Sequence, residues 1–174
     1  MNSSIRKAAP DDAPFIALLG RITFREAFGH VFPIEAELLE YFEKTFSVAK
    51  IRSSLEKENN VFWLAFADGL PVGYAKMKKY SPNADLPYPT GDMAQLQKIY
   101  VLRDFLSLRI GEQLQTAVFE ETQRLGKRAL WLAVWTGNDR ALRFYQKHDY
   151  TQEAALRHSI GSQTFDFEVM VRHF

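Results

Sequence analysis

The fold is decided by the stretch Leu96-Gln97-Lys98-Ile99-Tyr100-Val101-Leu102-Arg103-Asp104-Phe105-Leu106-Ser107-Leu108-Arg109-Ile110-Gly111. An apolar strand, expected over Ala94 to Val101, leads through a short basic loop into a helix headed by Glu112. Unpaired N–H groups and the dipole at a helix N-terminus attract anions, and Arg103 and Arg109 add charge that suits a pyrophosphate. Gly111 either lets a bulky ligand approach the backbone or merely eases packing at the helix start. The stretch therefore predicts a strand, an anion-binding loop and a helix.

The residues that follow predict a second strand parallel to the first. Apolar residues recur at helical spacing from Ile110 to Leu125 and stop at Gly126. Ala129 to Trp135 is apolar on both faces, which is typical of a central strand covered on both sides. A strand, a helix and a strand in this order form a right-handed crossover with parallel strands.

Upstream of this unit the pattern predicts an edge strand, three helices and a hairpin. The edge strand spans Ser4 to Ala8, and a helix starts at Asp11-Asp12 beside Pro14 and ends at Gly29. Its expected core-facing residues are Phe15, Leu18, Leu19, Ile22, Phe24 and Phe28. Two further helices span Glu35 to Phe46 and Ser47 to Leu55, and the hairpin strands Val61 to Phe66 and Val72 to Tyr80 meet at Asp68-Gly69. A proline-rich loop, Ser81 to Gly91, follows.

The chain ends with a helix from about Asp139 to His148 and two strands, Gln152 to His158 and Thr164 to Val171, joined across Gly161. The predicted fold class is α+β: a mixed, twisted sheet with helices on both faces. At 174 residues, one domain spanning 1–174 is expected. The tail strand, Thr164 to Val171, is expected to lie exposed and able to pair with another chain. The oligomeric state stays open between a monomer and a homodimer.

Composition excludes several classes of function. Lys and Arg number 22 against 21 Asp and Glu, a net charge of +1 that argues against nucleic acid or an anionic membrane as the main partner. The chain has no cysteine and its four histidines are scattered, so no metal site is expected. No signal peptide or membrane-spanning run is recognisable, and the expected location is the cytoplasm.

A second stretch, Trp135 to Tyr150, carries candidate chemistry. Asn138 is placed to cap the last helix, and Phe144 to pack in the core. Tyr145 is expected at the same end of the sheet as the Gly111 loop, where a phenol can donate a proton to a departing anion.

Together the two stretches resemble the GNAT superfamily of acyl-CoA-dependent N-acetyltransferases, in order and over nearly the whole chain. The final helix of that family commonly reads N-x-x-A-x-x-F-Y-x-K-x-G-F. The matching residues are Asn138, Ala141, Phe144, Tyr145 and Lys147, whereas Asp149 and Tyr150 stand where the family has Gly and Phe. The pyrophosphate loop of the family, Q/R-x-x-G-x-G/A, corresponds to Leu106 to Gly111, and only its last glycine is kept.

The resemblance implies a largely antiparallel sheet whose central parallel strand pair splays apart to hold CoA. It implies acetyl-CoA as the co-substrate, bound at the pantetheine by the backbone of Ile99 and Val101 and by Asn138. The amide of Tyr100 or Val101 would polarise the thioester carbonyl. Tyr145 would protonate the leaving thiolate, and Lys147 would reach the adenosine end. The pyrophosphate would lie on Leu106, Ser107, Leu108, Arg109, Ile110 and Gly111, with Arg103, Arg143 and Lys147 gathered around the phosphates.

Within the superfamily, the aromatic-rich runs Ile22 to Phe28, Ile99 to Val101 and Trp131 to Trp135 look like the PaiA type, which acetylates polyamines and other small amines. The resemblance thus implies an N-acetyltransferase acting by direct attack on the primary amine of a small molecule, a polyamine among the candidates. The acidic face of the second helix, with Glu35, Glu37, Glu40 and Glu43, is either a solvated surface or a lure for a cationic acceptor. Several aromatic side chains are candidate walls of the acceptor pocket.

The general base is the open element of this interpretation. Several family members carry Glu on the central strand, but Gln97 stands there and cannot accept a proton. The candidates are Glu26, His30 and Asp92, or a chain of water molecules. Two alternatives to a small-molecule enzyme are considered: a catalytically weakened CoA-binding or regulatory module, and a protein N-terminal acetyltransferase.

Overall fold

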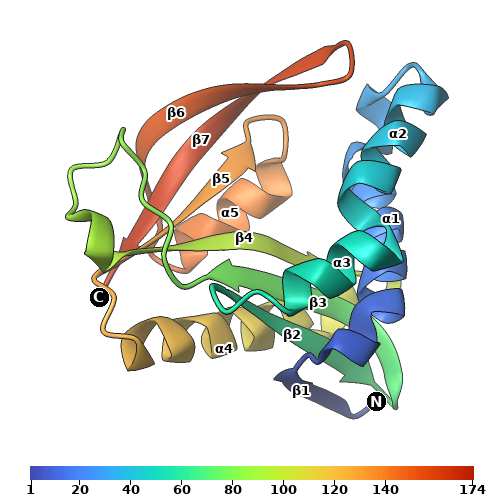
Figure 1. The fold of residues 1–174 in the computed structure, drawn as a ribbon, viewed down its shortest axis with the longest axis horizontal. Helices are drawn as coiled ribbons and strands as arrows, with labels where there is room; N and C mark the ends of the chain where they lie inside the picture. The colour runs from blue at the N-terminus through green and yellow to red at the C-terminus, as the bar shows by residue number, and fades with distance from the viewer.

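The protein is built on one seven-stranded sheet, with strand order β1-β2-β3-β4-β5-β7-β6 (Figure 1). The computed structural model describes residues 1–174. The strands are β1 (Ser3–Lys7), β2 (Asn60–Ala67), β3 (Leu70–Lys78), β4 (Met93–Val101), β5 (Ala129–Trp135), β6 (Thr151–Ile160) and β7 (Gln163–His173). All neighbours are antiparallel except β4 and β5. The predicted α+β fold with a mixed sheet is therefore confirmed.

The parallel pair is the feature that shapes the site. Only three residue pairs join β4 to β5, from Met93 opposite Ala129 to Gln95 opposite Trp131. Beyond them the two strands diverge, which leaves Leu96 to Val101 and Leu132 to Trp135 without ladder partners along their facing edges. The helix α4 (Ile110–Arg124) connects the two strands, as the crossover pattern predicts. The predicted splay is confirmed.

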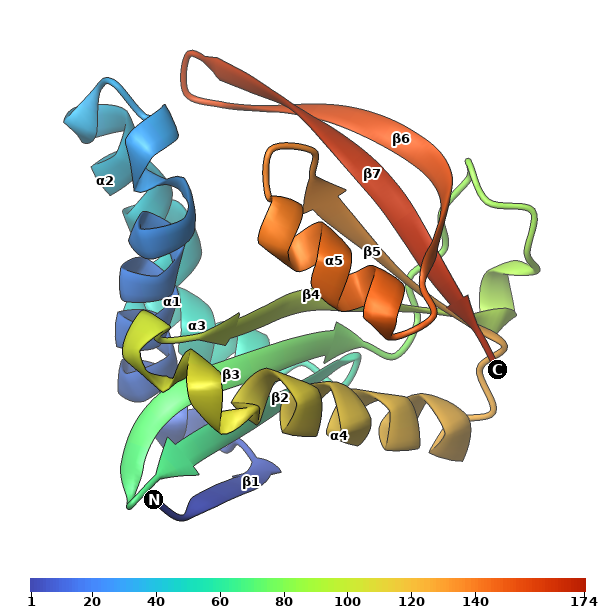
Figure 2. The ribbon, with the colours of Figure 1, turned by 180° about the vertical axis from the view of Figure 1, so that it is seen from behind.

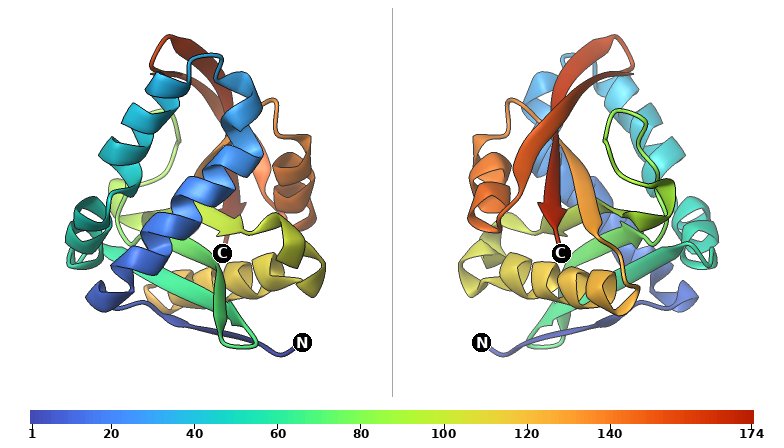
Figure 3. Two further views of the ribbon diagram at one scale, coloured as in Figure 1. Left: turned by 90° about the vertical axis from the view of Figure 1, so that its right-hand side faces the viewer. Right: turned by 90° about the vertical axis from the view of Figure 1, so that its left-hand side faces the viewer.

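Helices cover both faces of the sheet (Figures 2 and 3). On one face lie α1 (Ala13–Phe28), α2 (Glu35–Phe46) and α3 (Val48–Leu55). Their apolar side chains form a core with Phe62, Leu64 and Tyr74 of the sheet. On the other face lie α4 and α5 (Asp139–Lys147), where Ile110, Leu114 and Val118 pack against the reverse side of the strands. No helix of the chain is both long and apolar enough to cross a membrane.

The orientation of α1 differs from the prediction. Phe15, Leu18 and Ile22 were expected in the core, but they are exposed, Leu18 by 58%. The buried residues of α1 are Ala13, Ile16, Ala17, Leu19, Gly20, Thr23 and Phe24. The ring of Phe46 lies where a side chain at Gly20 would stand. The side of α1 that carries Gly20 therefore faces the core, because a glycine there lets the Phe46 ring of α2 come close.

The position of the tail strand also corrects the prediction. Thr164 to Val171 belongs to β7, which pairs with β5 on one side and β6 on the other, so it is an interior strand. The exposed edges of the sheet are β1, as predicted, and β6. The reason lies in the hairpin at Gly161: the chain passes first along the outside and then returns beside β5, from Phe167 opposite Trp135 to His173 opposite Ala129.

Candidate active site

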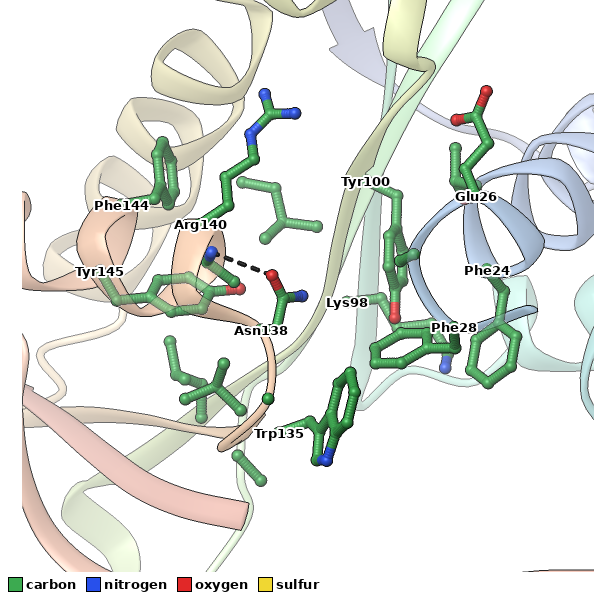
Figure 4. A pocket seen from close by; sticks show the side chains of 18 of the residues that line it. Phe24, Glu26, Phe28, Lys98, Tyr100, Trp135, Asn138, Arg140, Phe144 and Tyr145 are labelled. Atoms are coloured by element: carbon green, nitrogen blue, oxygen red, sulfur yellow. Dashed lines mark hydrogen bonds between the residues drawn. The ribbon is translucent and has the colours of Figure 1, made fainter. Parts of the chain in front are cut away.

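A cleft of about 800 Å³ opens where β4 and β5 diverge. The diverging ends of both strands line it, together with side chains from α1, α5 and the loop before α4. Figure 4 shows two groups of side chains on opposite sides of β4. We call the group on α5, namely Asn138, Arg140, Phe144 and Tyr145, the α5 side of the cleft. The α1 side consists of Phe24, Phe28, Lys98, Tyr100 and Trp135.

A β-bulge decides which side chains of β4 face each side. The β3–β4 register shifts between Lys76 and Met77, so that Lys98 and Leu96 have partners and Gln97 between them has none. An extra residue reverses the alternation of a strand beyond it. Tyr100 consequently packs with the α1–α3 core, whereas Ile99 packs with the α4 core. The side-chain oxygen Oε1 of Gln97 is buried at the cleft without a hydrogen-bond partner.

The rim of the cleft near the N-terminus of α4 is positively charged. Arg103, Arg109, Arg140 and Arg143 all line the cleft there. Packing does not explain Gly111, because a Cβ at this position would meet only the Phe144 ring, at an ordinary contact distance of 3.6 Å. Arg109 adopts a left-handed conformation, φ 55°, directly before the helix. Positive charge and an unobstructed helix N-terminus together make this rim suitable for a pyrophosphate.

The α5 side presents a polar amide and a phenol. The Asn138 Oδ1 atom accepts a hydrogen bond from the backbone N–H of Ala141 at 3.1 Å, which caps α5 as predicted. Burial raises the pKa of Tyr145 above its usual value, so its hydroxyl stays protonated near neutral pH. The ring of Tyr145 is held against Phe144 and Tyr150, each with its centroid at 5.5 Å.

The turn after α5 explains one departure from the family pattern. Asp149 has φ 60°, a left-handed conformation that glycine adopts without strain. Its carboxylate accepts a hydrogen bond from Arg172 Nη1 at 2.8 Å. Arg172 also donates to the carbonyl of His148 at 2.7 Å. The turn is therefore kept in place by side-chain contacts that a glycine could not make.

The cleft brings together most of the residues predicted for cofactor binding. Those that line it are Ile99, Tyr100, Val101, Leu106, Arg109, Gly111, Asn138 and Tyr145. The others lie outside its lining: Ser107 is exposed, Leu108 and Ile110 pack against the core, and Lys147 forms an ion pair with Glu112 at 2.5 Å. Lys147 thus has a protein partner on α4.

Two of the three candidate proton acceptors lie at the cleft. Glu26 and His30 line the cleft, whereas Asp92 does not. Asp92 lies at the start of β4, at the closed end of the parallel pair, with its carboxylate 3.7 Å from Arg128. The Glu26 carboxylate accepts a hydrogen bond from the backbone N–H of Arg103 at 3.1 Å, so it also fixes the loop that leads to α4.

The acidic face of α2 does not line the cleft. Its glutamates are paired at the surface: Glu35 with Arg25 at 2.6 Å, Glu40 with Lys44 at 2.5 Å and Glu43 with Arg21 at 2.8 Å. Glu37 binds Ser162 at the tip of the β6–β7 hairpin. The interpretation of this face as a lure for a cationic acceptor is thus wrong, because surface partners occupy these carboxylates.

Lys98 and Arg140 are charged cleft residues that were not identified as site residues from the sequence. Lys98 lies in the deciding stretch itself, but its orientation depends on the bulge at Gln97. Arg140 stands two residues after the Asn138 cap, on the amphipathic helix α5. The signal available for Arg140 was its position in the first turn of α5, directly after the Asn138 cap. Side chains in the first turn of a helix lie close to a ligand that binds at the N-terminus of that helix.

Comparison with known proteins agrees with this geometry. The family model described as Acetyltransferase (GNAT) family matches residues 24–150. The chain belongs to the GNAT acetyltransferase family. A Lactobacillus delbrueckii subsp. lactis protein described as an uncharacterized N-acetyltransferase in the pepI 3′ region is 26% identical over 148 residues, covering 85% of this chain and 84% of that protein. This GNAT protein is therefore an N-acetyltransferase, and acetyl-CoA is its co-substrate.

Solved GNAT structures share the fold along their whole length. The PaiA N-acetyltransferase from Thermoplasma acidophilum, solved in complex with coenzyme A, has a TM-score of 0.78 and 18% identity and covers 100% of both chains. A GCN5-related N-acetyltransferase from Rhodopseudomonas palustris has a TM-score of 0.77 and 19% identity, covering 100% of this chain and 97% of that one. At these identities the likeness extends to the fold.

Proposed function

We propose that this GNAT enzyme acetylates the primary amine of a small molecule. The observation that supports it is the contact between the β6–β7 hairpin and α2, which lie close together in Figures 1 and 2. Glu37 Oε2 accepts hydrogen bonds from the backbone N–H of Ser162 at 3.1 Å and from its hydroxyl at 2.8 Å. This contact bridges the α1 side of the cleft at its outer end, which favours a small acceptor over a polypeptide chain.

The walls of the α1 side support an acceptor of limited size. Phe24 and Phe28 have ring centroids 4.7 Å apart, and Trp135 lies 5.7 Å from Phe28 and 5.9 Å from Phe165. Apolar lining with a few polar groups is typical of small-molecule sites. This aromatic cluster between α1 and the central strands supports the proposal that these rings form the walls of the acceptor pocket.

The residues of the chain fit the co-substrate in two respects. The facing edges of β4 and β5 have backbone groups free beyond the three paired residues, and the arginine rim has charge for phosphates. We assign the pantetheine to the backbone of Ile99 and Val101 and to the Asn138 side chain, and the pyrophosphate to Leu106, Arg109 and Gly111. Bound acetyl-CoA supplies the activated acyl group. The backbone N–H of Tyr100 or Val101 is proposed as the donor to the thioester carbonyl.

Proton movement is assigned to two sides of the cleft. On the α5 side, the Tyr145 hydroxyl holds a proton that it can give to the leaving thiolate, as a general acid. An acceptor amine must be neutral to attack, and Glu26 and His30 are the cleft residues able to take its proton, directly or through water. Gln97, at the bulge, cannot do so.

Several finer predictions stay predictions. A PaiA-type preference for polyamines, a cytoplasmic location and a monomeric or homodimeric state are among them. The alternative of a weakened CoA-binding module is motivated by Gln97 and by Arg109, which stands where the family loop has its first glycine. The alternative of a protein N-terminal acetyltransferase is disfavoured by the bridged outer end of the cleft.

The test combines binding with turnover. Acetyl-CoA at a hundred times its dissociation constant is expected to stabilise the protein by about 2.7 kcal/mol, measured by thermal unfolding. CoA release is then followed over a panel of polyamines, amino acids, arylalkylamines and peptides with free N-termini. Acetylation of small amines but not peptides supports the proposal. Binding without transfer to any acceptor identifies a CoA-binding module, and transfer only to peptides identifies a protein acetyltransferase.

A further inference from the structure

Lys98 places a primary ammonium group inside the α1 side of the cleft. Its side chain leaves β4 on the same side as Tyr100, and its Nζ atom lies 5.1 Å from the centre of the Phe46 ring. Figure 4 shows Lys98 on the side of β4 that faces Phe24 and Phe28, opposite Tyr145. The amine therefore lies on the acceptor side and not among the arginines of the rim.

No carboxylate of the protein neutralises this amine. Lys98 takes part in none of the ion pairs or side-chain hydrogen bonds of the structure. Three acids line the cleft, Glu26, Glu112 and Asp139. Glu26 is bound to the backbone of Arg103, Glu112 is paired with Lys147, and Asp139 belongs to α5 on the far side of β4.

The groups around Lys98 add no negative charge either. The neighbouring strand β3 contributes Lys76, which stands directly opposite Lys98 in the ladder. β4 itself contributes Tyr100. The lining from the helices and hairpin contributes Tyr41, His30 and His158. Burial alone lowers the pKa of Lys98, to about 8, with no compensating effect from an acid. A partly buried cation without a counter-charge is unfavourable, and it is commonly kept where a ligand supplies that charge.

We infer that the acceptor of this enzyme carries a carboxylate that binds Lys98 while its amine faces the splayed strands. The inference rests on the proposed small-molecule function and narrows it to amino acids and similar zwitterionic amines. The carboxylate accepts hydrogen bonds from the Lys98 ammonium, and the aromatic walls contact the body of the acceptor. A fully cationic acceptor such as a polyamine would instead bring positive charge up to a positive group.

Matched pairs of acceptors test this inference. Lysine and cadaverine share both amines but differ by one carboxylate, and phenylalanine and phenethylamine differ in the same way. O-phosphoethanolamine and ethanolamine separate a phosphate from a carboxylate as the anion. The wild type is expected to favour the carboxylated member of the first two pairs by about tenfold or more in kcat/KM, as a hydrogen bond to a charged group allows. A stronger preference for the phosphate pair alone would overturn the assignment to a carboxylate.

Two variants show whether Lys98 causes the preference. Lys98→Met keeps a long side chain without charge and is expected to raise KM for the carboxylated amines about tenfold, with little change for their decarboxylated partners. Lys76→Met is the matched control, because Lys76 is also a partly buried lysine but does not line the cleft. It should leave the preference intact. An equal fall in kcat for both members of each pair in Lys98→Met would mean that Lys98 acts on a proton or on folding, and would contradict the inference.

The outcomes separate this inference from the proposed function. Transfer to cadaverine or phenethylamine with equal or greater efficiency would overturn the role of Lys98 while the small-amine function stands. Absence of transfer to any small amine would remove both. Binding of lysine or phenylalanine to the protein with CoA, followed by isothermal titration calorimetry, gives a second readout that does not depend on turnover. That binding should weaken in Lys98→Met and persist in Lys76→Met.

Discussion

Lys98 on β4 and Lys76 on β3 stand directly opposite each other in the antiparallel ladder, so that two ammonium groups share one face of the sheet. Like charges at directly opposed positions destabilise a sheet. Burial lowers the pKa of Lys98 to about 8. For Lys76, burial together with repulsion from Lys98, Lys78, Lys57 and Lys50 lowers the pKa to about 7. The pair therefore stores unfavourable electrostatic energy next to the cleft.

We expect the free enzyme to become more stable as the pH rises from about 7 to 9.5. A lysine with a lowered pKa in the folded state binds fewer protons than in the unfolded chain, so stability rises between the folded pKa and the ordinary value of 10.5. Lys98→Met should raise the free energy of unfolding at pH 7 by about 1 kcal/mol or more, since one pKa unit corresponds to about 1.4 kcal/mol. Urea unfolding over this pH range measures it. A wild-type profile that is flat or falls would show that the two amines are well solvated.

Arg109 allows backbone strain and phosphate binding to be separated. A left-handed residue other than glycine costs about 1–2 kcal/mol, so Arg109→Gly is expected to raise the free energy of unfolding by about 0.5–1 kcal/mol after the added freedom of the unfolded chain is counted. Arg109→Ala keeps the strain and removes the charge. Both variants should weaken acetyl-CoA binding by up to about fivefold at low salt, as expected for one exposed charge. Equal stability of the two variants would refute the strain, and unchanged affinity would remove Arg109 from the pyrophosphate site.

The side chain of Asn138 has one atom that caps α5 and one atom without a hydrogen-bond partner in the protein. Its Oδ1 caps α5 by accepting the Ala141 N–H, and its Nδ2 makes no hydrogen bond within the protein. Asn138→Ser keeps a capping oxygen without the amide donor, so stability should change by only a few tenths of a kcal/mol while KM for acetyl-CoA rises. Asn138→Ala should also lower the free energy of unfolding by about 1 kcal/mol. If Asn138→Ser binds acetyl-CoA as the wild type does, the side chain serves the helix alone.

The strands and the crossover could be predicted from local pattern, for physical reasons. Apolar runs such as Ala129 to Trp135 must be buried, and glycine or proline marks their ends. A helix that connects two such strands favours a parallel pair. The parallel pair in turn places Gly111, Asn138 and Tyr145 at one end of the sheet, where all three line the cleft.

The features that could not be predicted from the sequence depend on contacts between segments that are distant in the chain. Helix α1 is apolar on more than one face, and the side that packs depends on the approach of Phe46 to Gly20. Lys98 faces the α1 side because of a register shift opposite Lys76 and Met77, which nothing within β4 encodes. The carboxylates of Glu43, Glu35 and Glu37 on α2 lie away from the cleft, where they pair with Arg21, Arg25 and Ser162 respectively. Each of these outcomes depends on a partner far away in the chain.

Tyr145 and Tyr100 offer a direct comparison of two half-buried phenols on opposite sides of β4. Burial raises the pKa of both, so each stays protonated across the working range of the enzyme. Only Tyr145 lies beside Asn138, where the leaving thiolate is expected. Tyr145→Phe should lower kcat about a hundredfold, as loss of a general acid does, with little change in the dissociation constant for acetyl-CoA.

Tyr100→Phe is the matched control, because it removes a hydroxyl from the α1 side and leaves the backbone N–H of residue 100 in place. We expect its kcat to stay within about threefold of the wild type, since its hydroxyl lies on the α1 side of β4, away from the expected position of the sulfur. Single-turnover release of CoA at pH 7–9 measures the chemical step in both variants. Loss of turnover in Tyr100→Phe with normal turnover in Tyr145→Phe would move the acid to the α1 side and reverse the assignment of the two sides of the cleft.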